Sequence, residues 1–319
     1  MFLSLYRTLI AGTSLLSAAA GNLADAQAGA PSPALTAQQA IALAHSGHCK
    51  QALAPLRRMI PQLRDKAAKY NAQISLIRCA MALDEEQTAA DTLLQLKRDE
   101  PDNPEVLYLA THYFSELGVR AAQQLQGRAP GSYQARRLEA EALESQGKHD
   151  EAAVIYRKIL EENPNIPGIH YRLGQIALDR AGSGGSTDEA KREMQSEIEV
   201  DSSNASAQFV LGELARRAGD WNEAIAHFSQ AARLDAGFSE AYLALGMSQA
   251  AAGQFALAIS PLETYVKQQP DDPAGHYQIA LAYSRTGNKD GAAREMALQA
   301  QAASRMKPSD PTEGHPVHP

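Results

Sequence analysis

The segment "LGELARRAGDWNEAIAHF" (211–228) is followed by a similar segment, "LGMSQAAAGQFALAISPL" (245–262). The two segments share small and turn-forming residues at the same places. These pairs are Leu211 and Leu245, Gly212 and Gly246, Gly219 and Gly253, and Ala224 and Ala258. The alanine recurs at Ala152, Ala190, Ala224, Ala258 and Ala292. Its steps are equal except for the first, which is longer because "GSGG" (182–185) is inserted there. A fixed period of about 34 residues indicates a repeat protein.

Each period predicts two helices joined by a turn. Gly219 interrupts the first helix, and Asp220 with Glu223 forms a capping box that begins the second. Ala224 and Phe228 then lie one helical turn apart on the same face of that second helix. Because a single hairpin cannot bury its apolar face alone, neighbouring hairpins are expected to stack.

This pattern resembles the tetratricopeptide repeat, a helix–turn–helix of about 34 residues. The matching residues are Leu173-Gly174, Leu211-Gly212, Leu245-Gly246, Ala152, Ala224, Ala258, Tyr156, Phe228, Pro164 and Pro270. The resemblance covers residues 131–302, as five units that begin near 133, 167, 205, 239 and 273. It implies an all-α fold, a right-handed superhelical solenoid of antiparallel helix hairpins. Two residues depart from the pattern: Met194 replaces an aromatic residue, and Glu139 replaces a leucine.

The remaining segments are less regular. Residues 29–130 are interpreted as degenerate helical repeats, with "LYLATHYFSELG" (107–118) as the first helix of a third unit and a loop at 126–133. An unrelated helical cap is the alternative. The segment 303–319 contains four prolines and no apolar periodicity, which predicts a disordered tail.

The N-terminus has the layout of a secretory signal peptide, residues 1–28. Arg7 precedes an apolar run at 9–20, and Ala26-Gln27-Ala28 has the small-x-small form of a cleavage site. We therefore expect a bacterial protein that is periplasmic or secreted, with no membrane span after cleavage. The alternative is a single membrane anchor, although the apolar run is shorter than the roughly 20 residues that span a bilayer.

The sequence predicts no catalytic, metal or cofactor site. No metalloprotease, nucleophile-elbow or phosphate-loop motif occurs, and the paired carboxylates lie at helix ends, where they act as caps. His45, His48 and Cys49 could hold a metal, but no fourth ligand is near, so we interpret the histidines as exposed turn residues. The net charge is −7 without a basic block, which argues against nucleic-acid binding.

Function is therefore expected from the surface of the repeats. By resemblance, the first helix of each unit lines a concave groove suited to a protein or peptide partner. The predicted groove residues are Tyr171, Gln175, Phe209, Glu213, Arg217, Leu243, Met247, Tyr277, Leu281 and Arg285. The alternative is that these side chains only pack between adjacent first helices. The sequence lacks the Lys and Asn residues with which some family members hold a peptide carboxylate.

Two functions fit these expectations. The first is an exported, non-catalytic scaffold that binds a protein or peptide partner. The second is an adaptor for an envelope or polysaccharide enzyme, in which the groove holds a glycan or an enzyme domain. The groove has few aromatic residues, which favours the first.

Cys49 and Cys79 are the only cysteines, and an exported chain would place them in an oxidising compartment. Cys49 begins a second helix, and Cys79 lies late in the following first helix. Since successive helices run antiparallel, these two positions can meet, and we expect a disulfide. Two buried thiols are the alternative.

Overall fold

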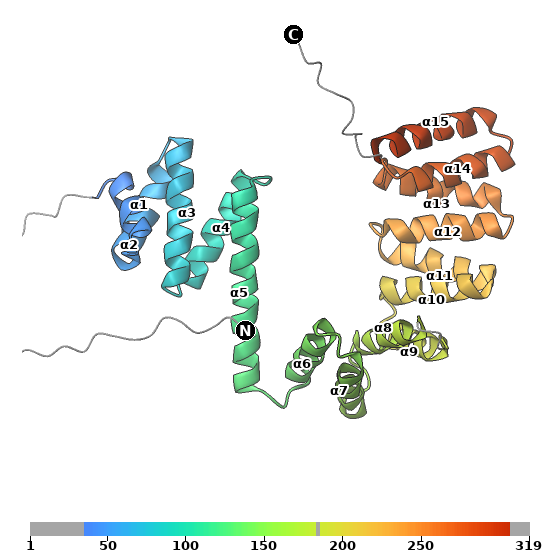
Figure 1. Ribbon diagram of the computed structural model, residues 1–319, viewed down its shortest axis with the longest axis horizontal. Helices are drawn as coiled ribbons and strands as arrows, with labels where there is room; N and C mark the ends of the chain where they lie inside the picture. The colour runs from blue at the N-terminus through green and yellow to red at the C-terminus, as the bar shows by residue number, and fades with distance from the viewer. Residues whose placement is uncertain (1–34, 183–185, 307–319) are drawn as a thin grey trace, which may run out of the picture. The chain divides into compact units, whose positions relative to one another are not determined.

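The computed structural model describes residues 35–182 and 186–306, which form fifteen α-helices and one short 3-10 helix, with no strand among them (Figure 1). The helices are α1 (Ala37–His45), α2 (Cys49–Met59), α3 (Lys66–Ala82), α4 (Glu86–Asp99), α5 (Pro104–Arg128), α6 (Tyr133–Ser145), α7 (His149–Glu162), α8 (Ile169–Ala181), α9 (Asp188–Val200), α10 (Ala205–Ala218), α11 (Trp221–Leu234), α12 (Ser239–Ala251), α13 (Phe255–Gln268), α14 (Pro273–Arg285) and α15 (Lys289–Met306). The 3-10 helix η1 (Ile60–Gln62) follows α2. The predicted all-α class is confirmed.

The chain divides into two compact units, with the boundary between Gly118 and Val119. The predicted signal peptide (1–28) lies outside the described residues. So does the predicted disordered tail beyond Met306, whereas residues 303–306 belong to α15.

The second unit contains the five predicted hairpins, α6–α7, α8–α9, α10–α11, α12–α13 and α14–α15. In four of them the turn contains a glycine with positive φ, such as Gly219 at +77°. A residue with a side chain is strained in this left-handed conformation, which explains why glycine returns at each of these turns.

Close approach of the two helices in a hairpin depends on a second small residue. A Cβ atom built on Gly212 would lie 2.6 Å from Cε1 of Phe228, on the facing helix. Gly246 stands in the same relation to Leu262, and Gly174 to Met194. The large side chain therefore occupies the space that glycine leaves open.

The two departures from the repeat pattern have physical explanations. Met194 is fully buried above Gly174, so its flexible side chain replaces the aromatic ring of other repeats. Glu139 is exposed on α6, whereas Leu173 and Leu211, the matching residues of the next two repeats, are buried. A charged residue at this place is therefore solvated.

The first unit begins with the hairpins α1–α2 and α3–α4. A disulfide joins Cys49, the first residue of α2, to Cys79 near the end of α3, with their Cα atoms 4.9 Å apart. The predicted disulfide is confirmed, and it links two successive hairpins. Both turns retain the left-handed conformation, with Gly47 at +80° and Asp84 at +58°.

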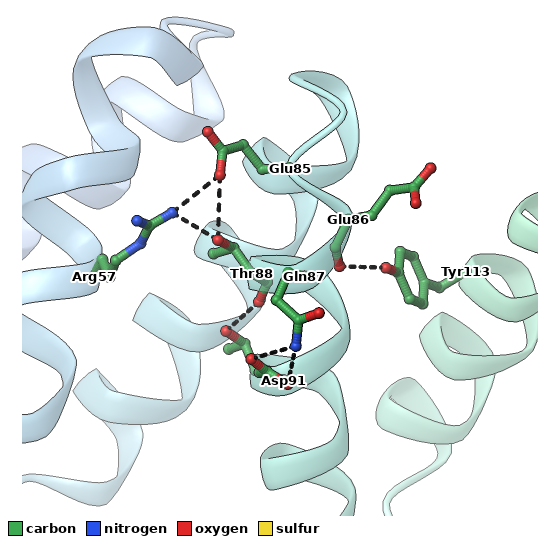
Figure 2. Close-up of polar contacts among 8 residues, drawn as sticks. Arg57, Glu85, Glu86, Gln87, Thr88, Asp91 and Tyr113 are labelled. Carbon is green, nitrogen blue, oxygen red and sulfur yellow. Dashed lines mark hydrogen bonds and ion pairs between the residues drawn. The ribbon is translucent and has the colours of Figure 1, made fainter.

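Polar contacts also join the helices of this unit, as Figure 2 shows. Nη2 of Arg57, on α2, donates to Oγ1 of Thr88 at 2.6 Å and to Oε2 of Glu85 at 3.2 Å. The hydroxyl of Tyr113, on α5, donates to the backbone carbonyl of Glu86 at 2.7 Å. Helices α2 and α5 are thus both attached to the start of α4.

The third N-terminal repeat is a single long helix. Helix α5 continues through Gly118, the place where other repeats turn, and ends at Arg128. The loop expected at 126–133 is shorter, because residues 126–128 are helical.

Candidate partner-binding surface

The ten residues predicted to line the groove lie on the first helices α8, α10, α12 and α14. We call this set the first-helix face. Recurrence at the repeat interval places the residues in equivalent positions on successive helices. Their side chains differ in exposure, which separates those available to a partner from those that hold the helices together.

The accessible part of the first-helix face lies toward its C-terminal end. Tyr277 on α14 is 50% exposed and Met247 on α12 is 36% exposed. Arg217 and Arg285 are also exposed. The guanidinium of Arg285 lies 5.4 Å from the centre of the Phe255 ring, which is a cation–π contact. This part of the face therefore combines an aromatic ring, a flexible thioether and cations.

Other members of the face are directed into the protein. The Phe209 ring lies 5.4 Å from that of Phe228 and 4.8 Å from that of Phe238, centre to centre. Leu243 is half-buried against the apolar cluster of α13 and α14 that contains Leu262. For Phe209 and Leu243, packing between helices is the role that the contacts show. Leu281 is half-buried.

The polar residues of the first-helix face form hydrogen bonds mainly within their own helices. Nε2 of Gln175 donates to the hydroxyl of Tyr171 at 2.9 Å. The Glu213 carboxylate accepts two bonds from the guanidinium of Arg216, at 3.0 and 2.7 Å, and this bonding raises the pKa of Arg216. These contacts orient the side chains along their own helices.

The structure contains polar contacts that the sequence did not predict. Glu197, in α9, is fully buried and accepts from the backbone N–H groups of Gly168 at 2.8 Å and Tyr171 at 3.1 Å. It therefore caps the start of α8, because these N–H groups have no partner within the helix. A buried acidic residue at this place could not be distinguished in the sequence from exposed glutamates nearby.

A second set of polar contacts closes three hairpins at equivalent places. Nδ1 of His276 lies 2.7 Å from Oε2 of Glu295. The matching pairs are His170 with Glu193 and Gln208 with His227, each also at 2.7 Å. The residue interval, 19 in two pairs and 23 across the insertion in the third, is the signal that could have revealed them.

Within 35–182 and 186–306, no group of three or more His, Cys, Asp or Glu residues is arranged to hold a metal ion. His45 and His48 are exposed, and Nδ1 of His48 lies 2.9 Å from the Ser46 hydroxyl. In the same ranges no helix is both long and apolar enough to cross a bilayer.

Comparison with known families identifies the repeats. Three tetratricopeptide repeat models match residues 134–176, 175–237 and 215–282, which together follow the hairpins from α6 into α14. No curated protein matches the sequence.

Several solved structures are similar in part. A crystal structure of MamA protein is 22% identical, with 56% of this chain and 98% of that chain covered and a TM-score of 0.48. YrrB, described as a TPR protein with an unusual peptide-binding site, is 18% identical, with 58% and 94% covered and a TM-score of 0.49. MamA 41-end from Desulfovibrio magneticus RS-1 is 14% identical, with 55% and 97% covered and a TM-score of 0.47.

The repeat interval, the glycine turns and the small residues beneath large ones all agree with the family models. Residues 134–282 of this chain are tetratricopeptide repeats.

Proposed function

We propose that the chain is a non-catalytic scaffold that binds a protein or peptide partner on the first-helix face. The observation that carries the proposal is the exposure of Tyr277 and Met247 on adjacent repeats. Aromatic residues and methionine are enriched in protein interfaces. Arg285, on the same helix as Tyr277, adds a cation suited to an acidic or carbonyl-rich partner.

Location outside the cytoplasm is part of the same proposal. The Cys49–Cys79 disulfide supports it, because such bonds persist in oxidising compartments. The predicted signal peptide supports it independently, from the sequence alone. A periplasmic or secreted scaffold would meet its partner in the cell envelope or outside the cell.

Site-directed photo-crosslinking tests the binding surface for any protein partner. A photoreactive residue at position 277 should form a specific adduct in cells. The same residue at Leu257, which is 61% exposed on the second helix α13, is the matched control. Adduct formation at both positions, or at 257 alone, would remove the support for the first-helix face.

A second experiment separates binding from folding. Tyr277→Ser combined with Met247→Ser should abolish capture of the crosslinked partner while leaving the helical circular dichroism unchanged, since neither side chain is buried. Phe209→Ser should instead lower the stability, because its ring packs against Phe228. Retained capture by the exposed double variant would contradict the proposal.

A further inference from the structure

Helix α5 is the first helix of a repeat that has no second helix of its own. In the six complete hairpins whose turn contains a left-handed residue, the residue seven places before that turn residue is buried. These residues are Ala40, Ile77, Ala140, Gly212, Gly246 and Ala280. Counted from Gly118, the equivalent residue of α5 is Thr111, and it is exposed.

The neighbours of Thr111 on α5 are apolar and also exposed. Leu107 is 42% exposed and Phe114 is 45% exposed. The Thr111 hydroxyl donates to the backbone carbonyl of Leu107 at 3.0 Å, so it is already satisfied within the helix. We call Leu107, Thr111 and Phe114 the open face of α5.

The opposite side of α5 packs against the preceding hairpin. Val106, Ala110 and Tyr113 are buried in the same apolar cluster as Leu93 and Leu96 of α4. The open face therefore belongs to a helix whose other side is buried. It continues directly from an interface that already exists within the unit.

The complete hairpins show what chemistry fits such a face. There, an antiparallel amphipathic helix places one large apolar side chain over the small residue. Phe228 occupies this place above Gly212, and Tyr156 shares a buried cluster with Ala140. Because Ala140 stands at the position of Gly212, this position accepts a residue larger than glycine.

Neither the chain's own next segment nor a second α5 fits as well. Residues 119–128, "VRAAQQLQGR", continue α5 itself, and Leu125 is their only large apolar residue apart from Val119 at the Gly118 junction. Pairing two copies of α5 about Thr111 would set a threonine opposite a threonine, with no large side chain between them. A helix from a different protein can supply the missing side chain.

We propose that the open face of α5 binds an amphipathic helix of a partner protein, which completes the third repeat in trans. This site lies in the first unit and is separate from the first-helix face of the second unit. The mode is the insertion of a helix along a complementary apolar surface, with residues one turn apart as anchors.

The chain itself supplies a suitable probe. A fluorescein-labelled peptide of residues 148–163, which contains α7, carries Tyr156 in the pattern that covers Ala140. Fluorescence anisotropy with the full mature protein should show binding, and circular dichroism should show that the peptide gains helix. Leu107→Glu combined with Phe114→Glu should weaken binding at least about tenfold, because two carboxylates then enter the apolar contact.

Matched controls distinguish this site from others. Leu257→Glu changes a leucine on α13 that is more exposed than Leu107, and it should leave binding unchanged. A peptide with Tyr156→Glu should not bind. Equal binding by the wild type and the double variant, or no binding by the wild type, would overturn the proposal.

Sedimentation velocity tests the competing occupant. Any self-association of the wild-type protein should be unchanged in the double variant that combines Leu107→Glu and Phe114→Glu. A dimer of the wild type that becomes a monomer in this double variant would overturn the proposal in favour of a second copy. The unfolding midpoint of the variant should match that of the wild type, since both side chains are exposed.

Discussion

Glycine has opposite effects on stability at two positions in this chain. Gly212 is needed because Phe228 occupies the space where a Cβ atom would lie. Gly118 lies within α5, has no neighbouring atom within 4 Å of an added Cβ, and does not adopt positive φ. Glycine is therefore a packing requirement at the first position and a cost in helix stability at the second.

This contrast gives a paired prediction. Gly212→Ala should lower the free energy of unfolding by about 1–3 kcal/mol, because the ring of Phe228 must move. Gly118→Ala should raise it by about 0.5–1 kcal/mol through helix propensity. Urea unfolding followed by circular dichroism measures both. A stabilised Gly212→Ala variant would show that the facing helices are not closely packed.

Burial of a histidine predicts a dependence of stability on pH. Burial lowers the pKa of His227, while Glu223 opposes and Lys191 reinforces the shift. Since the folded pKa lies below the ordinary value of about 6.5, protonation favours the unfolded state. The neutral ring is therefore fully stabilising above that pH, and stability falls as the pH drops through it toward the folded pKa.

His227→Gln should consequently lose less stability than the wild type between about pH 7.5 and pH 5.5. Urea unfolding at several pH values measures the two slopes. His45→Gln removes an exposed histidine and serves as the matched control. Parallel slopes for the wild type and His227→Gln would mean that folding does not lower the pKa of this ring.

At the scale of helices, the sequence predicted the regular hairpins and did not predict the features that differ between repeats. The period of about 34 residues determined every hairpin of the second unit, because the same small residues must lie beneath the same large ones. The first-helix face was predicted by position, but the exposure of each member was not. Phe209 lies at the position equivalent to Tyr277, yet it packs between Phe228 and Phe238. Only the neighbouring helices decide which ring faces water.

The same limit explains α5. "LYLATHYFSELG" has the pattern of a first helix, and Gly118 stands where a turn belongs. The helix nevertheless continues, because residues 119–128 lack the apolar series that would bring them back against Leu107 and Phe114. Glycine permits a turn, but packing of the following segment is required to form one.

The disulfide between α2 and α3 should be a main source of stability in the first unit. Replacing Cys49 and Cys79 by alanine should lower the free energy of unfolding by about 3–4 kcal/mol on the chain-entropy model. Reductant should reproduce the effect in the wild type and have none in the variant. Alkylation without reductant, followed by mass spectrometry, should add no group. Two added groups would show free thiols in the isolated protein.

For the molecule as a whole, export is the expectation that most affects function. We predict cleavage after Ala28, because small residues at 26 and 28 flank the expected site. Edman sequencing of the protein recovered from the periplasm or medium should begin at Gly29. Replacing Ala26 and Ala28 with Arg should block processing. Full-length wild-type chain in the membrane fraction would instead identify residues 9–20 as an anchor.

The disulfide between Cys49 and Cys79 also affects the order in which the repeats fold. Only 30 residues separate the two cysteines, and both belong to the first quarter of the chain. When a chain emerges N-terminus first, oxidation can therefore fasten the first two hairpins before any residue of α6 to α15 has appeared. The later repeats can then fold in sequence after hairpins that are already cross-linked. The disulfide would thus set where folding begins, in addition to stabilising the folded protein.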